Sequence, residues 1–211
     1  MSIRVVKMER EHIDQVVQVH LRAFTEFFTS FLGPGFLREF YRSFTEDPMG
    51  IGLVAEDTES RKVVGSVAGP LSPAGYFKRL LKRRWWAFCL GTLWAALKRP
   101  SIVPRLFRAM FYRGESPSGP DRALLCGVSV DPDAQRRGIG KTLVDAWAAE
   151  VRRRGGTGCF LVTDAHDNEA VNQFYAKCGW RVESTFARPD GRVMNRYVFD
   201  FQPQDREAKG D

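Results

Sequence analysis

Gln135-Arg136-Arg137-Gly138-Ile139-Gly140-Lys141-Thr142 is the most informative segment of the chain. It joins a strand-like apolar run, Ala123 to Val130, to a run of helical periodicity, Gly140 to Arg154. A loop that is both glycine-rich and basic, placed where a strand passes into a helix, presents backbone N–H groups and a helix N-terminus to one anion. The sequence therefore predicts a binding site for a phosphate or pyrophosphate.

Spacing excludes two common nucleotide-binding loops. A P-loop needs a glycine five residues before Gly140, where the chain has Gln135. A dinucleotide fingerprint needs a third glycine three residues after Gly140, where the chain has Leu143. Neither pattern accounts for the loop.

The loop fits a third pattern, Gln-x-x-Gly-x-Gly after a strand that ends in Val-Asp-Pro, and here the chain resembles the GNAT superfamily of N-acetyltransferases. Residues 128–132 and 135–140 match the principal motif of that family. A second match lies downstream, at the family spacing N-x-A-x-x-x-[LF]-Y-x-x-x-G-[FW]; its residues are Asn168, Ala170, Phe174, Tyr175, Gly179 and Trp180. Together the two matches cover about residues 124–182.

The resemblance implies that acetyl-CoA is the co-substrate and that no metal is required. In the family the loop holds the pyrophosphate of coenzyme A, and the preceding strand offers its backbone edge to the pantetheine arm. The expected contacts are Val128, Ser129, Val130, Gln135, Arg136, Arg137, Gly138, Ile139, Gly140, Lys141, Thr142, Asn168 and Tyr175.

Residue chemistry supports these contacts but also allows structural roles. Gly138 and Gly140 would let the backbone approach a diphosphate with no Cβ in the way. The basic side chains of the loop could add positive charge, or they could serve only solubility. Asn168 could contact the pantetheine arm, cap the following helix, or do both.

Tyr175 is the expected general acid, since in relatives a tyrosine at this position protonates the departing thiolate. Its alternative role is that of an aromatic core residue. The acceptor amine would attack the thioester directly, and the enzyme would supply orientation and a base or water chain. The candidate bases are Asp164 and His166, followed by His20, Glu26 and Glu39.

The expected fold class is α/β: a central mixed, mostly antiparallel twisted sheet with helices on both faces, a three-layer αβα arrangement. Residues 1–201 are predicted to form one domain with a helical insertion at about 71–112, and 202–211 a polar tail. The resemblance implies a splay between the strands at 123–130 and 159–163, where the cofactor enters. The other predicted strands are 3–6, 52–56, 62–68, 180–186 and 192–201, and the helices are 9–28, 36–44, 140–154 and 169–177.

Positive charge is concentrated in the insertion. The formal net charge is +7, yet residues 61–113 contain twelve basic and no acidic residues, and the rest of the chain holds 20 basic against 25 acidic residues. The apolar run 85–97 would span only ~20 Å as a helix, short of the ~30 Å of bilayer hydrocarbon. Amphipathic helices are therefore expected, with no transmembrane span.

The insertion has several candidate roles. It could cover the acceptor site and use Lys82, Arg83 and Arg84 on an anionic acceptor. It could instead lie on an anionic membrane, because Trp85, Trp86 and Trp94 stand beside basic clusters. Alternatively, the insertion could form an oligomer contact, bind single-stranded nucleic acid through 78–113, or simply cap the sheet.

Residues 1–14 lack the apolar segment of a secretory signal, and the four widely spaced cysteines suggest neither a disulfide framework nor a zinc site. A cytoplasmic location is expected. The predicted function is acetyl transfer from acetyl-CoA to the primary amine of a small acceptor, such as an amino sugar or an anionic nucleotide-linked amino sugar. The alternatives are a protein or peptide amine acetyltransferase and a non-catalytic module that binds acyl-CoA or nucleic acid.

Overall fold

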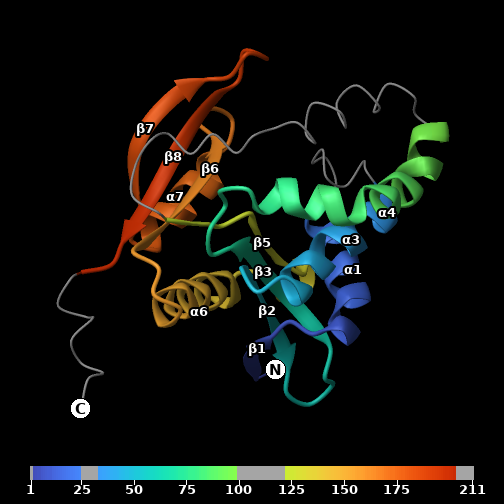
Figure 1. Cartoon of the computed structure of the whole chain (residues 1–211). Coiled ribbons are helices and arrows are strands. Elements are labelled where there is room, and N and C mark those ends of the chain that lie inside the picture. The colour runs from blue at the N-terminus through green and yellow to red at the C-terminus, as the bar shows by residue number, and fades with distance from the viewer. Residues whose placement is uncertain (1, 25–32, 99–121, 203–211) are drawn as a thin grey trace.

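The computed structural model describes residues 2–24, 33–98 and 122–202, apart from the side chains of 91–98. Within these ranges the strands form two four-stranded sheets (Figure 1). The first has the order β1 (Ile3–Lys7), β2 (Gly50–Asp57), β3 (Val63–Pro70) and β5 (Gly127–Val130). The second has the order β4 (Ala123–Leu124), β6 (Gly158–Asp164), β8 (Val193–Asp200) and β7 (Arg181–Ala187). Among these pairings only β4 with β6 is parallel, so the expected mixed, mostly antiparallel architecture is confirmed.

Helices cover both faces of the first sheet. On one face lie the short 3-10 helix η1 (Arg10–His12), α1 (Ile13–Ala23) and α3 (Gly33–Glu46). On the other lies α6 (Ile139–Arg153), and α7 (Glu169–Lys177) follows β6 (Figure 1). The inserted helix α4 (Tyr76–Lys98) packs mainly against α3. The three-layer arrangement and the helical character of the insertion are therefore confirmed over these residues.

Alternation along β2 explains how one sheet supports two apolar layers. Ile51 and Ala55 lie in the cluster that contains Leu143 and Trp147 of α6, whereas Val54 lies in the cluster formed with α1 and α3. Successive side chains of a strand point to opposite faces, so a strand that is apolar at every position must be covered on both. Most residues of β2 and β3 are apolar and buried in this way, whereas Glu56 of β2 and Ser66 of β3 are buried polar residues.

The predicted strand 123–130 is in fact two strands that belong to different sheets. The Leu125 N–H donates to the Phe160 carbonyl at 2.9 Å, in the second sheet. The next residue, Cys126, donates instead to the Ala68 carbonyl at 2.9 Å, in the first. The chain thus changes partner within one residue, and among the described strands none pairs with the outer edge of β5. The sequence pattern missed this change because both halves are apolar.

Two helix boundaries also differ from expectation. The helix predicted for 9–28 begins as the 3-10 turn η1, and α1 ends at Ala23; residues 25–28 lie outside the described ranges. Gly33-Pro34-Gly35, which precedes the helix predicted at 36–44, forms the first turn of α3. Proline is tolerated there because the first N–H groups of a helix have no intrahelical partner. The end of the predicted insertion, from residue 99, and most of the polar tail also lie outside the described ranges.

Candidate functional site

The loop between β5 and α6 is held in a specific turn. After β5 the chain passes through the 3-10 helix η2 (Pro132–Ala134), and the Gln135 side-chain amide donates to the Val130 carbonyl at 3.2 Å. Arg136 and Gly138 both adopt left-handed backbone, with φ of 61° and 78°. Alternation between left- and right-handed residues directs consecutive N–H groups toward one side, which is the geometry of an anion-binding nest.

The N-terminus of α6 is open for a ligand. Its N-cap is Gly138, no side chain caps the first turn, and a Cβ built on Gly138 would meet no atom within 4 Å. The first N–H groups of a helix need partners from outside the helix and favour negative charge. An anionic group therefore fits at this end of α6.

Gly140 has a different reason to lack a side chain. A Cβ there would lie 3.3 Å from the Phe174 ring on α7 and 3.7 Å from Val130. This glycine allows α7 to pack closely against the first turn of α6. Gly140 thus has a packing reason to lack a side chain, and the expectation that Gly138 and Gly140 let the backbone approach a diphosphate stays a prediction.

Two of the polar side chains of the loop already have protein partners. The Lys141 ammonium lies 2.6 Å from Asp145, and this contact raises its pKa. The Thr142 hydroxyl donates to the Gly138 carbonyl at 3.2 Å. Arg136 and Arg137 are exposed. Backbone amides are therefore the stronger candidates for phosphate contacts.

Arg22 of α1 contacts the start of the loop, a contact that sequence reasoning missed. Its guanidinium donates to Asp131 at 2.6 Å and to Asp133 at 2.8 Å, and it holds the pKa of Asp133 below its usual range. These two carboxylates lie at the start of the loop, and without Arg22 they would repel a phosphate. No local pattern could have revealed this contact, since Arg22 and Asp131 are 109 positions apart.

On β5, side chains point away from any ligand at the strand edge. Val128 and Val130 pack against the core cluster that includes α6, and Ser129 is buried with its hydroxyl 2.8 Å from that of Ser66. β5 is an edge strand among the described strands, but the Val130 carbonyl already accepts the Gln135 amide, so use of this edge by a cofactor stays a prediction.

A buried polar chain lies behind β5. Beyond Ser129 and Ser66 it continues to Tyr41, whose hydroxyl lies 2.7 Å from Nδ1 of His20. Burial lowers the pKa of His20 to about 4 and raises that of Tyr41 well above its usual range. All four groups are therefore uncharged at neutral pH. Of these four residues, only His20 was among the candidates identified from sequence as a base.

Asn168 stands at the N-cap of α7 without capping it. Its amide instead donates to the Thr163 hydroxyl at 2.8 Å and to the Asp164 carbonyl at 3.2 Å, at the end of β6. Asn172, one turn further along, donates to the same Asp164 carbonyl at 3.0 Å. These bonds fix α7 to the end of β6. The Asn168 side chain therefore makes no capping hydrogen bond to α7, and its contact with the pantetheine arm stays a prediction.

Tyr175 lies in an aromatic cluster on α7, with ring centroids 5.1 Å from Phe174, 5.9 Å from Trp180 and 5.9 Å from Tyr197. Burial raises the pKa of its phenol well above the usual range. The hydroxyl therefore keeps its proton at neutral pH. Both expected roles, core packing and proton donation, are compatible with this placement.

The remaining candidates differ in their surroundings. Asp164 ends β6 with its carboxylate 3.5 Å from Arg192, and His166 is exposed on the loop that follows. Glu39 forms ion pairs with Arg42 and Arg84, so it is not a ready base. Glu26 lies outside the described residues.

Nothing else in the described ranges suggests a different chemistry. Those ranges hold no group of three or more His, Cys, Asp and Glu side chains that could bind a metal ion. They also contain no helix that is long and apolar enough to cross a membrane.

The site combines the edge strand β5, the uncapped N-terminus of α6 at Gly138, and Asn168 and Tyr175 at α7. This combination is that of an acyl-CoA-dependent acetyltransferase. The family model described as "Acetyltransferase (GNAT) family" matches residues 17–180. The chain belongs to this family, whose members use acetyl-CoA.

Solved structures share the fold at low sequence identity. The ribosomal-protein-S18-alanine N-acetyltransferase from Escherichia coli is 14% identical, with a TM-score of 0.56 and 94% of each chain covered. An aminoglycoside 6'-acetyltransferase type Ii is 16% identical, with a TM-score of 0.61, 95% of this chain and 98% of that one covered. A protein assigned as a streptothricin acetyltransferase from Bacillus anthracis, in complex with acetyl-CoA, is 14% identical, with a TM-score of 0.50. The match covers 77% of this chain and 68% of that one. No curated protein sequence matches this chain.

Proposed function

We propose that this chain is an N-acetyltransferase that moves the acetyl group of acetyl-CoA to the primary amine of a small acceptor. The observation that carries the proposal is the junction of three elements: the outer edge of β5, the uncapped N-terminus of α6 and the start of α7. Gly140 of the first turn of α6 lies against the Phe174 ring of α7, which supports a site shared by these elements.

Residues 136–139 would bind the pyrophosphate through backbone N–H groups, with Arg136 and Arg137 adding charge. The β5 backbone and the Asn168 carbonyl would orient the pantetheine arm. Holding the thioester and the amine in one geometry makes their bimolecular reaction effectively unimolecular, which lowers its entropic barrier. Lys141 and Thr142 would contribute less, because Asp145 and Gly138 already engage them.

Tyr175 would donate its proton to the sulfur as the thiolate leaves. Burial raises the pKa of the Tyr175 phenol, so the hydroxyl is protonated at neutral pH and has a proton to place on the sulfur as negative charge develops there. The amine must lose a proton as the new bond forms. Asp164 and His166 at the end of β6 stay the proposed acceptors of that proton, directly or through water.

The acceptor is proposed to be an amino sugar or a nucleotide-linked amino sugar. Lys82 and Arg83 of α4 are exposed and could meet an anionic acceptor, whereas Arg84 is held by Glu39 and Glu46. The structural neighbours include acetyltransferases named for an aminoglycoside, for spermidine and spermine, and for a ribosomal-protein alanine, so the fold accommodates amines of very different size.

The test is thiol release from acetyl-CoA by the purified chain, screened over amino sugars, nucleotide-linked amino sugars, polyamines and peptide N-termini. Turnover with an amino sugar class and none with peptides is expected. Turnover confined to peptides would favour a protein or peptide amine acetyltransferase. Measurable CoA binding without turnover on any acceptor would support a non-catalytic acyl-CoA-binding module.

A further inference from the structure

The outward side of α4 carries an unusual combination of residues. Four basic side chains, Lys78, Arg79, Lys82 and Arg83, lie on its first half, and all four are exposed. Three large apolar side chains are exposed just beyond them: Trp85 at 59%, Trp86 at 53% and Leu90 at 65%. These seven residues are called the basic-aromatic face below. Large apolar side chains gathered on one exposed surface mark interaction sites.

The helix has a separate inward side, so this exposure does not reflect a loosely attached segment. Tyr76 is fully buried and its hydroxyl donates to Ser43 of α3 at 3.1 Å. Ala87 and Phe88 are also buried, and the Phe88 ring lies 5.0 Å from that of Phe36. Apolar residues on the opposite side of the same helix therefore need another partner.

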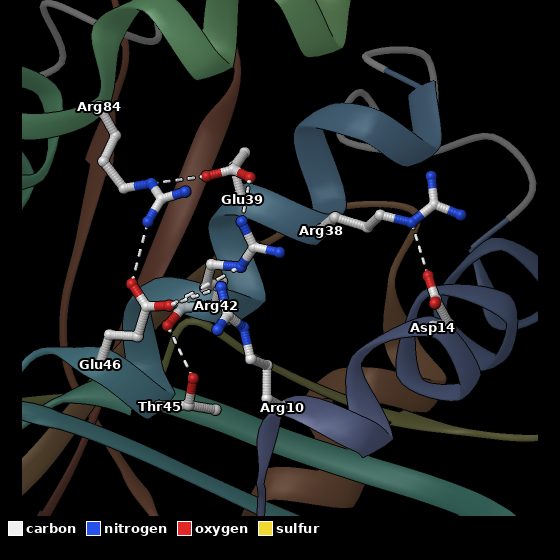
Figure 2. A network of polar contacts seen from close by, with 8 residues as sticks. All are labelled: Arg10, Asp14, Arg38, Glu39, Arg42, Thr45, Glu46 and Arg84. Atoms are coloured by element: carbon white, nitrogen blue, oxygen red, sulfur yellow. Dashed lines mark hydrogen bonds and ion pairs between the residues drawn. The ribbon is translucent and has the colours of Figure 1, made fainter.

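Arg84 fixes the direction in which the face points. Figure 2 shows its guanidinium reaching Glu39 and Glu46 of α3, at 2.7 Å and 2.9 Å. The backbone of Arg84 departs from helical geometry, with φ of −133° and ψ of 17°, so α4 bends at this residue. One cation thus turns inward and holds the bend, while the neighbouring cations and tryptophans stay outside.

The charge of the face selects its partner. α4 contains no acidic residue, and Asp47, which lines a hollow with Arg79 and Arg83, is outnumbered by the four cations. A second copy docking through the same face would bring two sets of these cations together, which disfavours a symmetric dimer. The partner must combine negative charge with an apolar layer.

We propose that the basic-aromatic face binds an anionic membrane surface. Tryptophan is suited to the boundary between headgroups and acyl chains, and Lys and Arg are attracted to anionic headgroups. Leu90 favours a membrane over nucleic acid, because it can enter an acyl layer but has no ring on which a base could stack. Trp94 lies among residues 91–98, whose side chains are not described.

The experiment is co-sedimentation of the full chain with vesicles of neutral phosphatidylcholine, and with vesicles that also contain phosphatidylglycerol. Binding to the anionic vesicles, weakened by salt, is expected. Lys82→Gln with Arg83→Gln should lower partitioning by roughly 25-fold, since each near-surface charge contributes about fivefold. The matched control, Lys7→Gln with Lys62→Gln, removes two exposed charges from β1 and the β2–β3 connection and should bind as the wild type does.

The apolar part of the face is tested by Trp85→Ser, Trp86→Ser and Leu90→Ser combined, with Val182→Ser, an exposed apolar residue of β7, as the control. The triple variant should lose most vesicle binding while its thermal unfolding stays unchanged. Equal binding to neutral and anionic vesicles, no binding to either, or tighter binding to a single-stranded oligonucleotide would overturn the proposal. The proposal would also be overturned if the Lys82→Gln, Arg83→Gln variant bound vesicles as the wild type does but had a higher KM for the acceptor. That result would mean that these two charges bind the acceptor.

Discussion

Burial sets the protonation of the residues that matter most in this protein. Tyr175 stays a phenol, and the His20 imidazole stays neutral, because a charge at either position would lose its hydration. At the loop a charged partner matters instead, since the exposed Arg22 contacts the carboxylates of Asp131 and Asp133 and offsets one of their two negative charges. The chemistry of each residue thus depends on whether water or a charged partner surrounds it.

Replacing Tyr175 with Phe should lower kcat by about 10²-fold or more, because the leaving thiolate loses its proton donor. Thiol-release kinetics at saturating acetyl-CoA would measure the effect. The dissociation constant of CoA should be nearly unchanged, since the ring and its packing remain. An unaltered kcat would leave Tyr175 with only its aromatic contacts.

Arg22→Gln should weaken CoA binding severalfold, because Asp131 and Asp133 would then face the phosphate site without a cation. Isothermal titration with CoA is the measurement. Arg38→Gln is the control, since Arg38 pairs with Asp14 of α1 instead. Equal affinities for the two variants would show that Arg22 only ties α1 to the loop.

His20 predicts a specific pH dependence of stability. Its pKa is about 4 in the folded chain against an ordinary value of 6.5, so the unfolded state binds the additional proton between these values. Stability is therefore complete above pH 6.5 and falls by up to about 3 kcal/mol as the pH drops to 4. Urea unfolding of His20→Gln over the same range should lack this component. Parallel pH curves for the variant and the wild type would contradict the assignment.

At the scale of elements, α4 is an insertion that depends on α3. Glu39, Arg42 and Glu46 of α3 form a chain of ion pairs that ends on Arg84, and Arg10 reaches the same Glu46 (Figure 2). The Glu39 and Arg84 side chains are only 12% and 22% exposed, so solvent screens their contact less than it would a surface pair. The bend of α4 and its orientation both follow from this contact.

Arg84→Ala should destabilise the attachment of α4 by about 1–3 kcal/mol, since it leaves the Glu39 carboxylate without this partner. Hydrogen exchange should then increase in residues 76–90 more than in α6. Lys82→Ala, an exposed neighbour, serves as the control. A double-mutant cycle with Glu39→Ala that gave no coupling would assign the effect to lost packing of the arginine stem.

At the scale of the whole molecule, two sheets share one core. The cluster around α6 includes residues of β2 and β3 in the first sheet and of β6 and β8 in the second. The crossing from β4 to β5 joins the sheets covalently while their strands diverge. The proposed cofactor path runs where the chain passes from one sheet to the other.

Trp147 lies at the centre of this shared core, fully buried, with its indole N–H donating to the Ile51 carbonyl at 3.3 Å. Trp147→Ala should lower the free energy of unfolding by about 3–5 kcal/mol, and CoA binding should weaken with it. Urea unfolding is the measurement, with Trp147→Phe as a milder comparison. A loss below about 1 kcal/mol would mean that the sheets are held together elsewhere.

Local patterns predicted much of this protein from sequence alone. Residues 135–140 predicted the turn and the open helix N-terminus, because glycine and short-range spacing act within one turn of chain. The pattern from Asn168 to Trp180 predicted α7 with the boundaries that the structure shows. Family membership followed from these two motifs and was confirmed.

Long-range contacts were decided only by the tertiary structure. The division of 123–130 between two sheets depends on which carbonyl each N–H meets, and Phe160 and Ala68 are distant in sequence. The same holds for Arg22 beside Asp131, the His20 and Tyr41 pair, and the Arg84 contacts that leave the basic-aromatic face outward. Periodicity records whether a residue is buried, but a charged or polar side chain finds its partner only when the folded chain brings the two together.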